Sequence, residues 1–338
     1  MLLSGLRNVA RRAARRREVP PVQVSSAQGD WVSREQAIMG TSVRVELWSD
    51  DRAAGEPAIA SVMAEMHRID DTMSPFKPES ELSRINREAA QRPVPVSRAM
   101  YDIIARSIEF SILSAGAFDI TFASVGRLYD YRRGIRPSDE DLERARAAVG
   151  YRNLMLDPKM QTVFFAHPGV QIDLGGFAKG LAVDNGAAIL KGRGITNAIV
   201  TAGGDSHILG DRRGRPWTIG IRDPRRPGEV VAVLPLQGGV AISTSGDYER
   251  YFERDGTRCH HVIDPGTGKS PNGVRSVTII AEDGLTSEGL TKSVFVMGVE
   301  KGMRLVESLE AVDAVVVDAA GVLHYSSGLL DGAPQSRR

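Results

Sequence analysis

A glycine pair followed by a lysine is the part of this sequence best suited to bind a phosphate group. Residues 173–180 read Asp-Leu-Gly-Gly-Phe-Ala-Lys-Gly. The glycines let a ligand approach the backbone because neither has a Cβ, and a helix that begins here would turn free N–H groups toward an anion. Lys179 adds a mobile cation. The spacing fits neither a Walker A loop nor Gly-x-Gly-x-x-Gly, and an ordinary glycine turn is the alternative.

Three further short segments combine glycine or histidine with groups that bind or react. Gly203-Gly204-Asp205 and Ser245-Gly246-Asp247-Tyr248 each place glycine beside an acid or a hydroxyl, a pattern that is more typical of a turn than of a site when it stands alone. His260 and His261 precede a Pro-Gly turn. A histidine there could act as a general base; a strand histidine with a satisfied hydrogen bond is the alternative.

Glu288 and Lys292 form the fifth candidate. They are four residues apart in a predicted helix and therefore share a helix face. The plain interpretation is a surface ion pair worth about 0.2–0.5 kcal/mol. A carboxylate at this place could also bind a hard cation such as Mg²⁺.

The predicted elements that must position these groups are mixed helices and strands. Alternation predicts a strand over 41–45, and Ile59, Met63, Met66 and Ile69 predict one buried helix face. A second helix begins at Ser97, with Ile104, Ile108 and Ile112 on its face. Val170, Ile172 and Leu174 predict a strand that feeds the glycine pair, and a helix follows over 177–190. Further strands are predicted over 198–201, 217–221, 230–235, 240–243, 277–281, 314–317 and 323–325, and a helix over 286–297. Short turns between neighbouring strands favour an α+β fold over a doubly wound parallel sheet.

Composition narrows the classes of partner. The chain has 338 residues, 42% of them hydrophobic, and a formal net charge of +1, so nothing in its charge points to nucleic acid. Its single cysteine, Cys259, excludes a disulfide within the chain. No stretch reaches the roughly 18 apolar residues that a transmembrane span needs.

The first 30 residues are expected to form a basic disordered tail, followed by one domain over 31–338. Arginines precede the first acidic residue, Glu18, but Pro20 and Pro21 stand where a secretory signal would have its apolar core. The segment is therefore not a complete export signal. An incomplete targeting segment is the alternative, and the compartment stays open.

The order and spacing of these segments resemble the ApbE family, the FAD:protein FMN transferases. The resemblance runs from about Ile38 to Gly328. It is carried by the segments 39–41 (Met-Gly-Thr), 73–76 (Met-Ser-Pro-Phe), 80–86, 116–119 (Gly-Ala-Phe-Asp), 173–180, 203–205, 245–248, 261–268 and 295–298.

This resemblance implies an α+β fold of duplicated α/β motifs with mixed or antiparallel sheets. It implies FAD as ligand and substrate, usually with Mg²⁺, and transfer of FMN to a threonine or serine hydroxyl of an acceptor protein with release of AMP. Some members instead hydrolyse FAD to FMN and AMP. Many members are periplasmic, which this chain would share if it is exported.

The resemblance also assigns expected roles to residues. His261 is expected to help deprotonate the acceptor hydroxyl. The metal positions are Gly176, through its backbone carbonyl, Glu288 and Lys292. The positions expected to contact FAD are Met39, Phe76, Ala117, Phe118, Asp119, Asp173, Lys179 and Ile263.

One departure bears on mechanism. The family usually has Asp, three residues, then Thr in the last helix, where this chain has Glu288 and Lys292. A protonated lysine cannot bind Mg²⁺ and repels it. Two hypotheses follow: Lys292 partly replaces the metal by pairing with the pyrophosphate, or the site binds FAD but transfers FMN poorly. The second would make the chain a non-transferring FAD carrier or an assembly factor for a redox complex.

Overall fold

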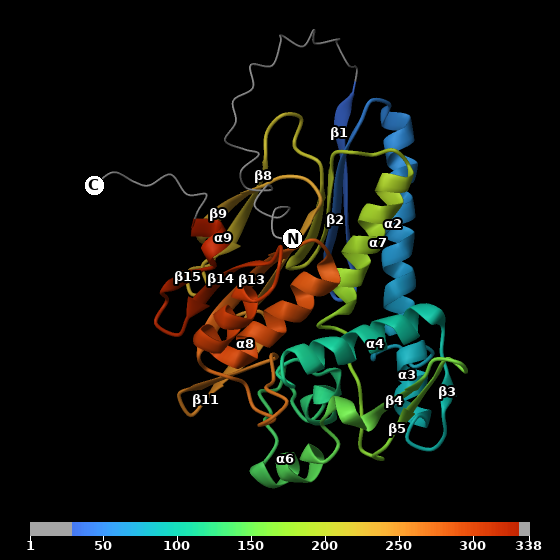
Figure 1. Cartoon of the computed structure of the whole chain (residues 1–338), viewed down its shortest axis with the longest axis vertical. Helices are drawn as coiled ribbons and strands as arrows, with labels where there is room; N and C mark the ends of the chain where they lie inside the picture. The colour runs from blue at the N-terminus through green and yellow to red at the C-terminus, as the bar shows by residue number, and fades with distance from the viewer. Residues whose placement is uncertain (1–28, 331–338) are drawn as a thin grey trace, which may run out of the picture.

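The computed structural model describes residues 29–330, so residues 1–28 of the predicted tail lie outside the described range. An eight-stranded sheet forms the centre of the molecule (Figure 1). Every neighbouring pair in it is antiparallel. The strand order is β1 (Asp30–Ile38), β2 (Thr41–Ser49), β6 (Ala198–Ala202), β7 (Asp205–Leu209), β10 (Val240–Gly246), β13 (Val274–Ala281), β14 (Asp313–Asp318) and β15 (Leu323–Tyr325).

Three long helices cover one face of this sheet: α2 (Arg52–Met73), α7 (Ala178–Gly192) and α8 (Gly284–Glu307). α2 and α7 lie side by side, and α7 also packs against α8 (Figure 1). The predicted face of α2 is confirmed, because Ile59, Met66 and Ile69 are fully buried. Burial of this apolar face against the sheet is what stabilises a helix of this length in a protein.

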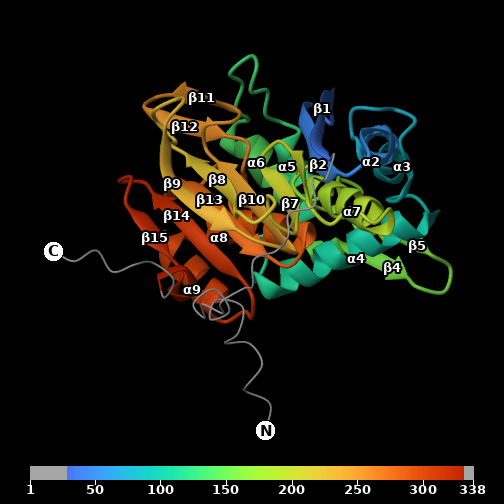
Figure 2. The same cartoon turned by 90° about the horizontal axis from the view of Figure 1, so that it is seen from above.

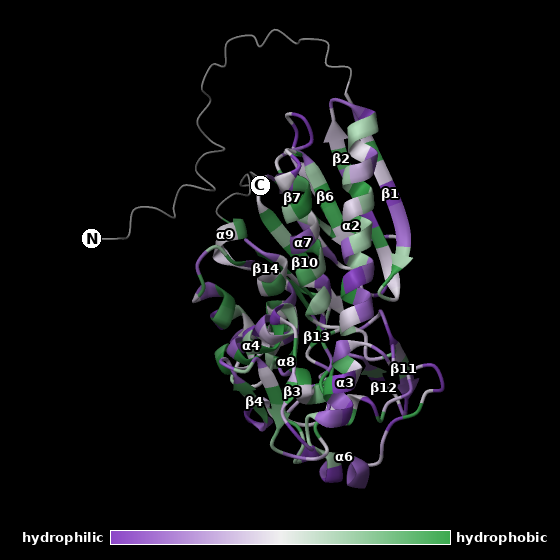
Figure 3. Cartoon of the chain, turned by 90° about the vertical axis from the view of Figure 1, so that its right-hand side faces the viewer, coloured by the Kyte–Doolittle hydropathy of each residue, from purple (hydrophilic) through white to green (hydrophobic). Residues whose placement is uncertain are grey.

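The opposite face of the sheet is covered by a hairpin of β8 (Trp217–Arg222) and β9 (Val230–Leu236) (Figure 2). Trp217 and Leu234 from the hairpin join Ile242 and Val315 from the sheet in a second hydrophobic cluster. Successive strand residues face opposite sides, so β14 sends Val315 here and Val316 to the helical side. Figure 3 shows mostly hydrophilic colouring on the edge strand β1.

The remaining elements gather below the sheet in Figure 1. A small sheet has the order β3-β5-β4, and β11 pairs with β12 as a hairpin. No helix in the described range is both long and apolar enough to cross a bilayer. The elements below the sheet are α3 (Glu81–Glu88), β3 (Val94–Pro95), α4 (Arg98–Leu113), η1 (Ile120–Phe122), α5 (Ala123–Gly126), α6 (Asp139–Arg146), η2 (Tyr151–Asn153), β4 (Leu154–Asp157), β5 (Thr162–Phe165), β11 (Tyr251–Arg254) and β12 (Thr257–His260). The short helix α9 (Ser327–Leu330) ends the described chain.

The prediction of an α+β fold with antiparallel sheets is confirmed, but three local predictions differ from the structure. Residues 170–174 are not a strand, because Ile172 bonds through its N–H and C=O to the side chain of Asn86 rather than to a neighbouring strand. Ile112 of α4 is 62% exposed, since that helix turns Met100 and Phe110 inward instead. The last long helix continues past its expected end at 297, with a break at Gly298 where φ is 78°.

Gly180 sets the distance between α7 and α8. A Cβ added there would lie 2.3 Å from the carbonyl oxygen of Gly284, which is a backbone atom and cannot swing away. We therefore expect Gly180→Ala to lower the free energy of unfolding by about 1–3 kcal/mol or more, by overpacking. Urea titration followed by circular dichroism measures this loss. The control is Gly192→Ala in the same helix, where an added Cβ meets nothing within 4 Å. Its free energy of unfolding should equal that of the native protein or exceed it by up to about 1 kcal/mol. Equal stabilities for the two variants would contradict the close crossing.

Candidate active site

Lys179 is held between two carboxylates at the start of α7. Its Nζ donates to Oδ2 of Asp205 at 2.5 Å and to Oε1 of Glu288. Oε2 of Glu288 accepts the N–H of Gly180 at 2.7 Å, one of the N–H groups that the first turn of a helix leaves free. The Asp205 and Glu288 side chains are 2% and 0% exposed. The helix start predicted to bind an anion therefore meets a carboxylate of the chain itself in this structure.

Lys292 adds a second ammonium to this group. Its Nζ lies 3.6 Å from Oε1 of Glu288 and donates to Oγ1 of Thr291 at 3.3 Å. Its side chain passes over the glycine turn, since a Cβ added to Gly176 would lie 3.3 Å from its Cε. The simple surface ion pair is wrong, because the Lys292 side chain is only 19% exposed and that of Glu288 is fully buried. We call Lys179, Asp205, Glu288 and Lys292 the lysine–carboxylate cluster.

The two lysines of the cluster differ electrostatically. Burial works to lower the pKa of Lys179, but the Asp205 and Glu288 carboxylates outweigh it and raise this pKa above the usual value. Burial lowers the pKa of Lys292 against the attraction of Glu288, and the Lys179 ammonium adds to the lowering. Lys179 is thus the fixed cation of the cluster. Lys292 is the one whose charge has the weaker partner.

Hydroxyl pairs between β10 and α8 fix the position of Glu288. Ser243 Oγ lies 2.7 Å from Ser287 Oγ, and Ser245 Oγ lies 2.8 Å from Thr291 Oγ1. The two serines are two residues apart on the strand and their partners are four apart on the helix, so both pairs lie on one face of each element. These buried pairs fix the rotation of α8 that turns Glu288 toward α7.

Asp205 is the member of the cluster that was absent from the expected site residues, although the Gly203-Gly204-Asp205 segment stands out in the sequence. Its Oδ1 has no hydrogen-bond partner within residues 29–330. Gly203 has φ of +62°, and a Cβ there would lie 2.7 Å from Oγ1 of Thr41. This contact brings the β1–β2 turn, which contains Met39, next to the turn that leads into Asp205. Met39 itself has a positive φ of 54°.

The two adjacent histidines have different environments. Nε2 of His260 lies 2.8 Å from the carbonyl oxygen of Pro271, so this is the structural histidine that the sequence offered as an alternative. His261 is half-buried, and its Nδ1 has no hydrogen-bond partner in the described part of the chain. Burial, together with the charges of Lys292 and Arg250, lowers the pKa of His261 to about 3. His261 is therefore neutral at physiological pH, with one ring nitrogen unprotonated.

The fold should lose stability as the pH falls below about 6.5, because His261 is held neutral. The unfolded chain takes up this proton near the ordinary pKa of 6.5, whereas in the fold the pKa is about 3. Between these values the unfolded state binds more protons, so stability rises with pH and is lost on acidification. From pH 7 to pH 5, His261 should account for a loss of about 2 kcal/mol.

Urea titrations of the native protein and of His261→Gln at both pH values isolate this contribution. Glutamine does not titrate, so groups common to the two proteins cancel in the difference. The native protein should lose about 2 kcal/mol more than the variant on going from pH 7 to pH 5. Equal losses would mean that His261 is not held neutral.

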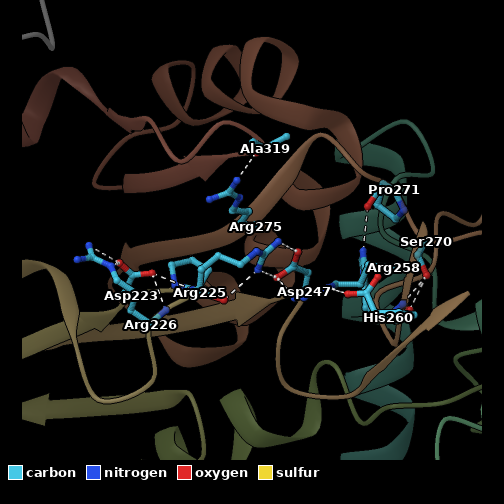
Figure 4. Close-up of polar contacts among 12 residues, drawn as sticks. Asp223, Arg225, Arg226, Asp247, Arg258, His260, Ser270, Pro271, Arg275 and Ala319 are labelled. Atoms are coloured by element: carbon cyan, nitrogen blue, oxygen red, sulfur yellow. Dashed lines mark hydrogen bonds and ion pairs between the residues drawn. The ribbon is translucent and has the colours of Figure 1, made fainter. Parts of the chain in front are cut away.

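A network of arginine–carboxylate pairs holds the hairpin that carries the histidines (Figure 4). Arg225, from the β8–β9 hairpin, donates to both oxygens of Asp247 at 2.7 and 2.6 Å, and Arg258 of β12 reaches the same carboxylate at 3.5 Å. Ser270 accepts the N–H of His260 at 2.9 Å and donates to its carbonyl oxygen at 2.6 Å. Asp247, from the Ser-Gly-Asp-Tyr segment, therefore ties the β8–β9 hairpin to the β11–β12 hairpin, which ends at His260.

Two of the positions expected to contact FAD through apolar side chains lie in hydrophobic clusters. Phe118 is 5% exposed, and its ring packs against those of Phe110 and Phe177 at centroid distances of 5.9 and 5.2 Å. Ile263 is 5% exposed and shares a small cluster with Tyr129. A ligand could meet these two residues only through their backbone or one edge of the side chain.

The two expected aspartates fix local backbone. Asp119 accepts hydrogen bonds from the N–H groups of Thr121 at 2.9 Å and Tyr151 at 2.6 Å, and burial raises its pKa despite them. Asp173 accepts the N–H of Gly175 at 2.6 Å and so shapes the glycine turn. Burial raises the pKa of Asp173 as well, against that hydrogen bond and the charge of Arg250.

The other two expected contacts lie in loops. Phe76, between α2 and α3, is 84% exposed, and Ala117, after α4, is half-buried. The structure thus brings Gly176, Lys179, Glu288 and Lys292 into direct contact and places His261 near enough for its pKa to respond to both lysines.

The donor set at Gly176, Glu288 and Lys292 does not fit Mg²⁺. A hard cation needs oxygen ligands with free lone pairs, but the Glu288 carboxylate already meets Lys179, Lys292 and the Gly180 N–H. Within the described residues, no three His, Cys, Asp or Glu side chains are grouped to hold a metal ion. The two lysine ammonium groups beside Glu288 would also repel a cation.

Comparison with known proteins gives one family. The ApbE family model matches residues 39–316. The FAD:protein FMN transferase of Vibrio cholerae is 34% identical over 297 residues, which are 86% of this chain and 88% of that protein. The FAD:protein FMN transferase of Treponema pallidum is 31% identical over 317 residues, 88% of each chain.

Solved structures agree with the sequence comparison. The ApbE protein of Thermotoga maritima matches with a TM-score of 0.83 and 34% identity, covering 90% of this chain and 100% of that one. The flavin transferase ApbE of Vibrio cholerae matches with a TM-score of 0.80 and 31% identity, covering 90% and 99%. With a family model over most of its length and relatives of the same fold above 30% identity, this chain belongs to the ApbE family.

Proposed function

We propose that this protein transfers FMN from FAD to a threonine or serine hydroxyl of an acceptor protein and releases AMP. The observation that carries the proposal is that His261, whose Nδ1 has no hydrogen-bond partner among the described residues, lies close enough to two lysine ammonium groups at a glycine turn and helix start for their charges to lower its pKa. The turn and the lysines suit a pyrophosphate. The histidine suits the deprotonation of a hydroxyl.

The proposed step balances without a further reactant. The acceptor oxygen forms a bond to the phosphorus of the FMN half of FAD, and the P–O bond to the AMP phosphate breaks. AMP leaves with that electron pair, while His261 takes the hydroxyl proton and passes it on to solvent. The lysines stabilise the negative charge that spreads over the phosphate oxygens during attack. No part of this step is routed through a metal ion.

The loops that contain Phe76 and Met39 are suited to the flavin part of FAD. Phe76 offers an exposed aromatic ring on which an isoalloxazine ring can stack, and the turn with Met39 lies next to the turn that leads into Asp205. We infer that the flavin lies toward these loops while the pyrophosphate lies at the start of α7.

The test is an incubation of the purified protein with FAD and a panel of candidate acceptor domains that each expose one threonine, paired with their Thr→Ala forms. Intact-mass spectrometry reports the acceptor and chromatography reports AMP. The expected result is a mass gain of one FMN less one water on threonine forms only, with AMP in equal amount. Binding of FAD without either product across the panel would overturn the proposal and favour a flavin carrier.

A further inference from the structure

Lys292 has hydrogen-bonding capacity that the protein leaves unused. An ammonium group can donate three hydrogen bonds. Among the described residues, the Lys292 Nζ donates only to Thr291 Oγ1 at 3.3 Å, and its distance of 3.6 Å to Glu288 Oε1 is beyond hydrogen-bond reach. Lys179, in contrast, donates to two carboxylates. A cation this deeply placed and this weakly paired is suited to an anion that arrives from outside.

The path of the Lys292 side chain directs it to the glycine turn. Its Cε lies 3.3 Å from the position that a Cβ on Gly176 would take, so the side chain passes over the loop that begins α7. The ammonium group lies at the end of the next bond. It therefore approaches the same helix start, where the Gly180 N–H already meets the Glu288 carboxylate and where the positive end of the helix dipole and Lys179 favour an anion.

The charges of the cluster also favour an added anion over an added cation. Two ammonium groups face two carboxylates, so the cluster neutralises itself without any added ion. A divalent cation placed here would meet two positive charges within a poorly solvated region, where repulsion between like charges is stronger than in water. A pyrophosphate dianion would instead find one ammonium, that of Lys292, free to turn toward it.

We propose that Lys292 is a phosphate-binding residue that stands in the position of a divalent cation, so that this protein binds the FAD pyrophosphate without Mg²⁺. This inference rests on the proposed function and names the group that holds the substrate. In this proposal, the ammonium group that makes the site unsuitable for Mg²⁺ is the group that binds the substrate.

The experiment is a titration of FAD with the full-length protein, followed by quenching of flavin fluorescence, in EDTA and in excess Mg²⁺. Four proteins are compared: native, Lys292→Met, Lys292→Thr and Lys301→Met. Methionine keeps the length of the side chain without its charge. Lys301 lies on the exposed part of the same helix and serves as the matched control. Circular dichroism and melting curves check that each variant is folded.

The native protein should bind FAD equally well in EDTA and in Mg²⁺, and Lys301→Met should match it. Lys292→Met should bind about 10- to 100-fold more weakly in EDTA, the range expected for loss of a charge-assisted hydrogen bond. Lys292→Thr should be weakened in EDTA and tightened by Mg²⁺, because its hydroxyl is an oxygen donor.

Native binding that requires Mg²⁺ would overturn the inference, and so would undiminished binding by Lys292→Met in EDTA. A Lys292→Thr variant that Mg²⁺ fails to rescue would refute the cation position assigned to Lys292. If a variant does not fold, the native measurement in EDTA still decides. Failure of the native protein to bind FAD under either condition would sink the proposed function itself, whereas Mg²⁺-dependent binding would leave that function standing.

Discussion

Replacing His261 with Gln is expected to slow FMN transfer about 100- to 10,000-fold, the range over which a positioned general base contributes to catalysis. Glutamine keeps the polarity of the site but cannot take up a proton. Because Nδ1 of His261 makes no hydrogen bond within residues 29–330, its loss should leave no buried partner unpaired. FAD affinity should change little, since we place the pyrophosphate at the lysines and the glycine turn.

The matched control is His260→Gln. His260 lies next to His261 in sequence, but its Nε2 is committed to the carbonyl oxygen of Pro271 at 2.8 Å. That substitution should lower the free energy of unfolding, while the rate of FMN transfer should stay close to that of the native protein. Single-turnover transfer at saturating FAD separates the chemical step from binding. Equal slowing by both variants would mean that the hairpin as a whole matters and that neither histidine acts as the base.

The contrast between the two histidines shows what the sequence could not predict. His260 is the last residue of β12 and His261 follows it outside the strand, so the two side chains do not share one environment. Which one has a partner depends on Pro271, which approaches from beyond the Pro-Gly turn. The motif alone left either histidine as the candidate base, the family resemblance pointed to His261, and the Pro271 contact commits His260 to another partner.

Spacing along one helix or strand could be read from the sequence, whereas contacts between different elements could not. The i, i+4 rule correctly placed Glu288 and Lys292 on one helix face. It could not show that this face is buried, because burial depends on the serines of β10. Asp205 was absent from the expected site residues for the same reason, as its partner Lys179 belongs to another element.

The fold follows a similar division. Apolar periodicity predicted the buried face of α2 and most strands of the sheet, because burial on one side produces that pattern directly. The segment 170–174 has the same apolar alternation without being a strand. The N–H and C=O of Ile172 at its centre are satisfied by the Asn86 side chain, and a side-chain partner leaves no periodic trace in the sequence. The order of strands in the sheet is likewise set by pairings that no local pattern encodes.

The lysine–carboxylate cluster leads to the second large prediction: Lys179→Met should lower the free energy of unfolding by about 3–5 kcal/mol. Lys179 is the cation shared by Asp205 and Glu288, whose side chains are 2% and 0% exposed. Removing one partner of a buried ion pair costs far more than the pair contributes, because the remaining charge has lost both water and its counterion. Chemical denaturation at pH 7 measures the loss, and Lys191→Met at the exposed end of the same helix is the control.

A double variant shows whether the cost comes from the uncompensated charge. In Lys179→Met/Asp205→Asn, one buried carboxylate is gone, so the double variant should be more stable than Lys179→Met alone; strictly additive losses would argue against coupling. The pH dependence of the stability loss gives an independent test. The stranded carboxylates of Lys179→Met favour their protonated forms, so the folded variant takes up protons before the unfolded chain does and gains stability as the pH falls. The deficit relative to the native protein should therefore shrink from pH 7 to pH 5. A deficit that stays constant with pH would instead assign the loss to packing of the lysine side chain, and the cluster would then hold the fold by shape and not by charge.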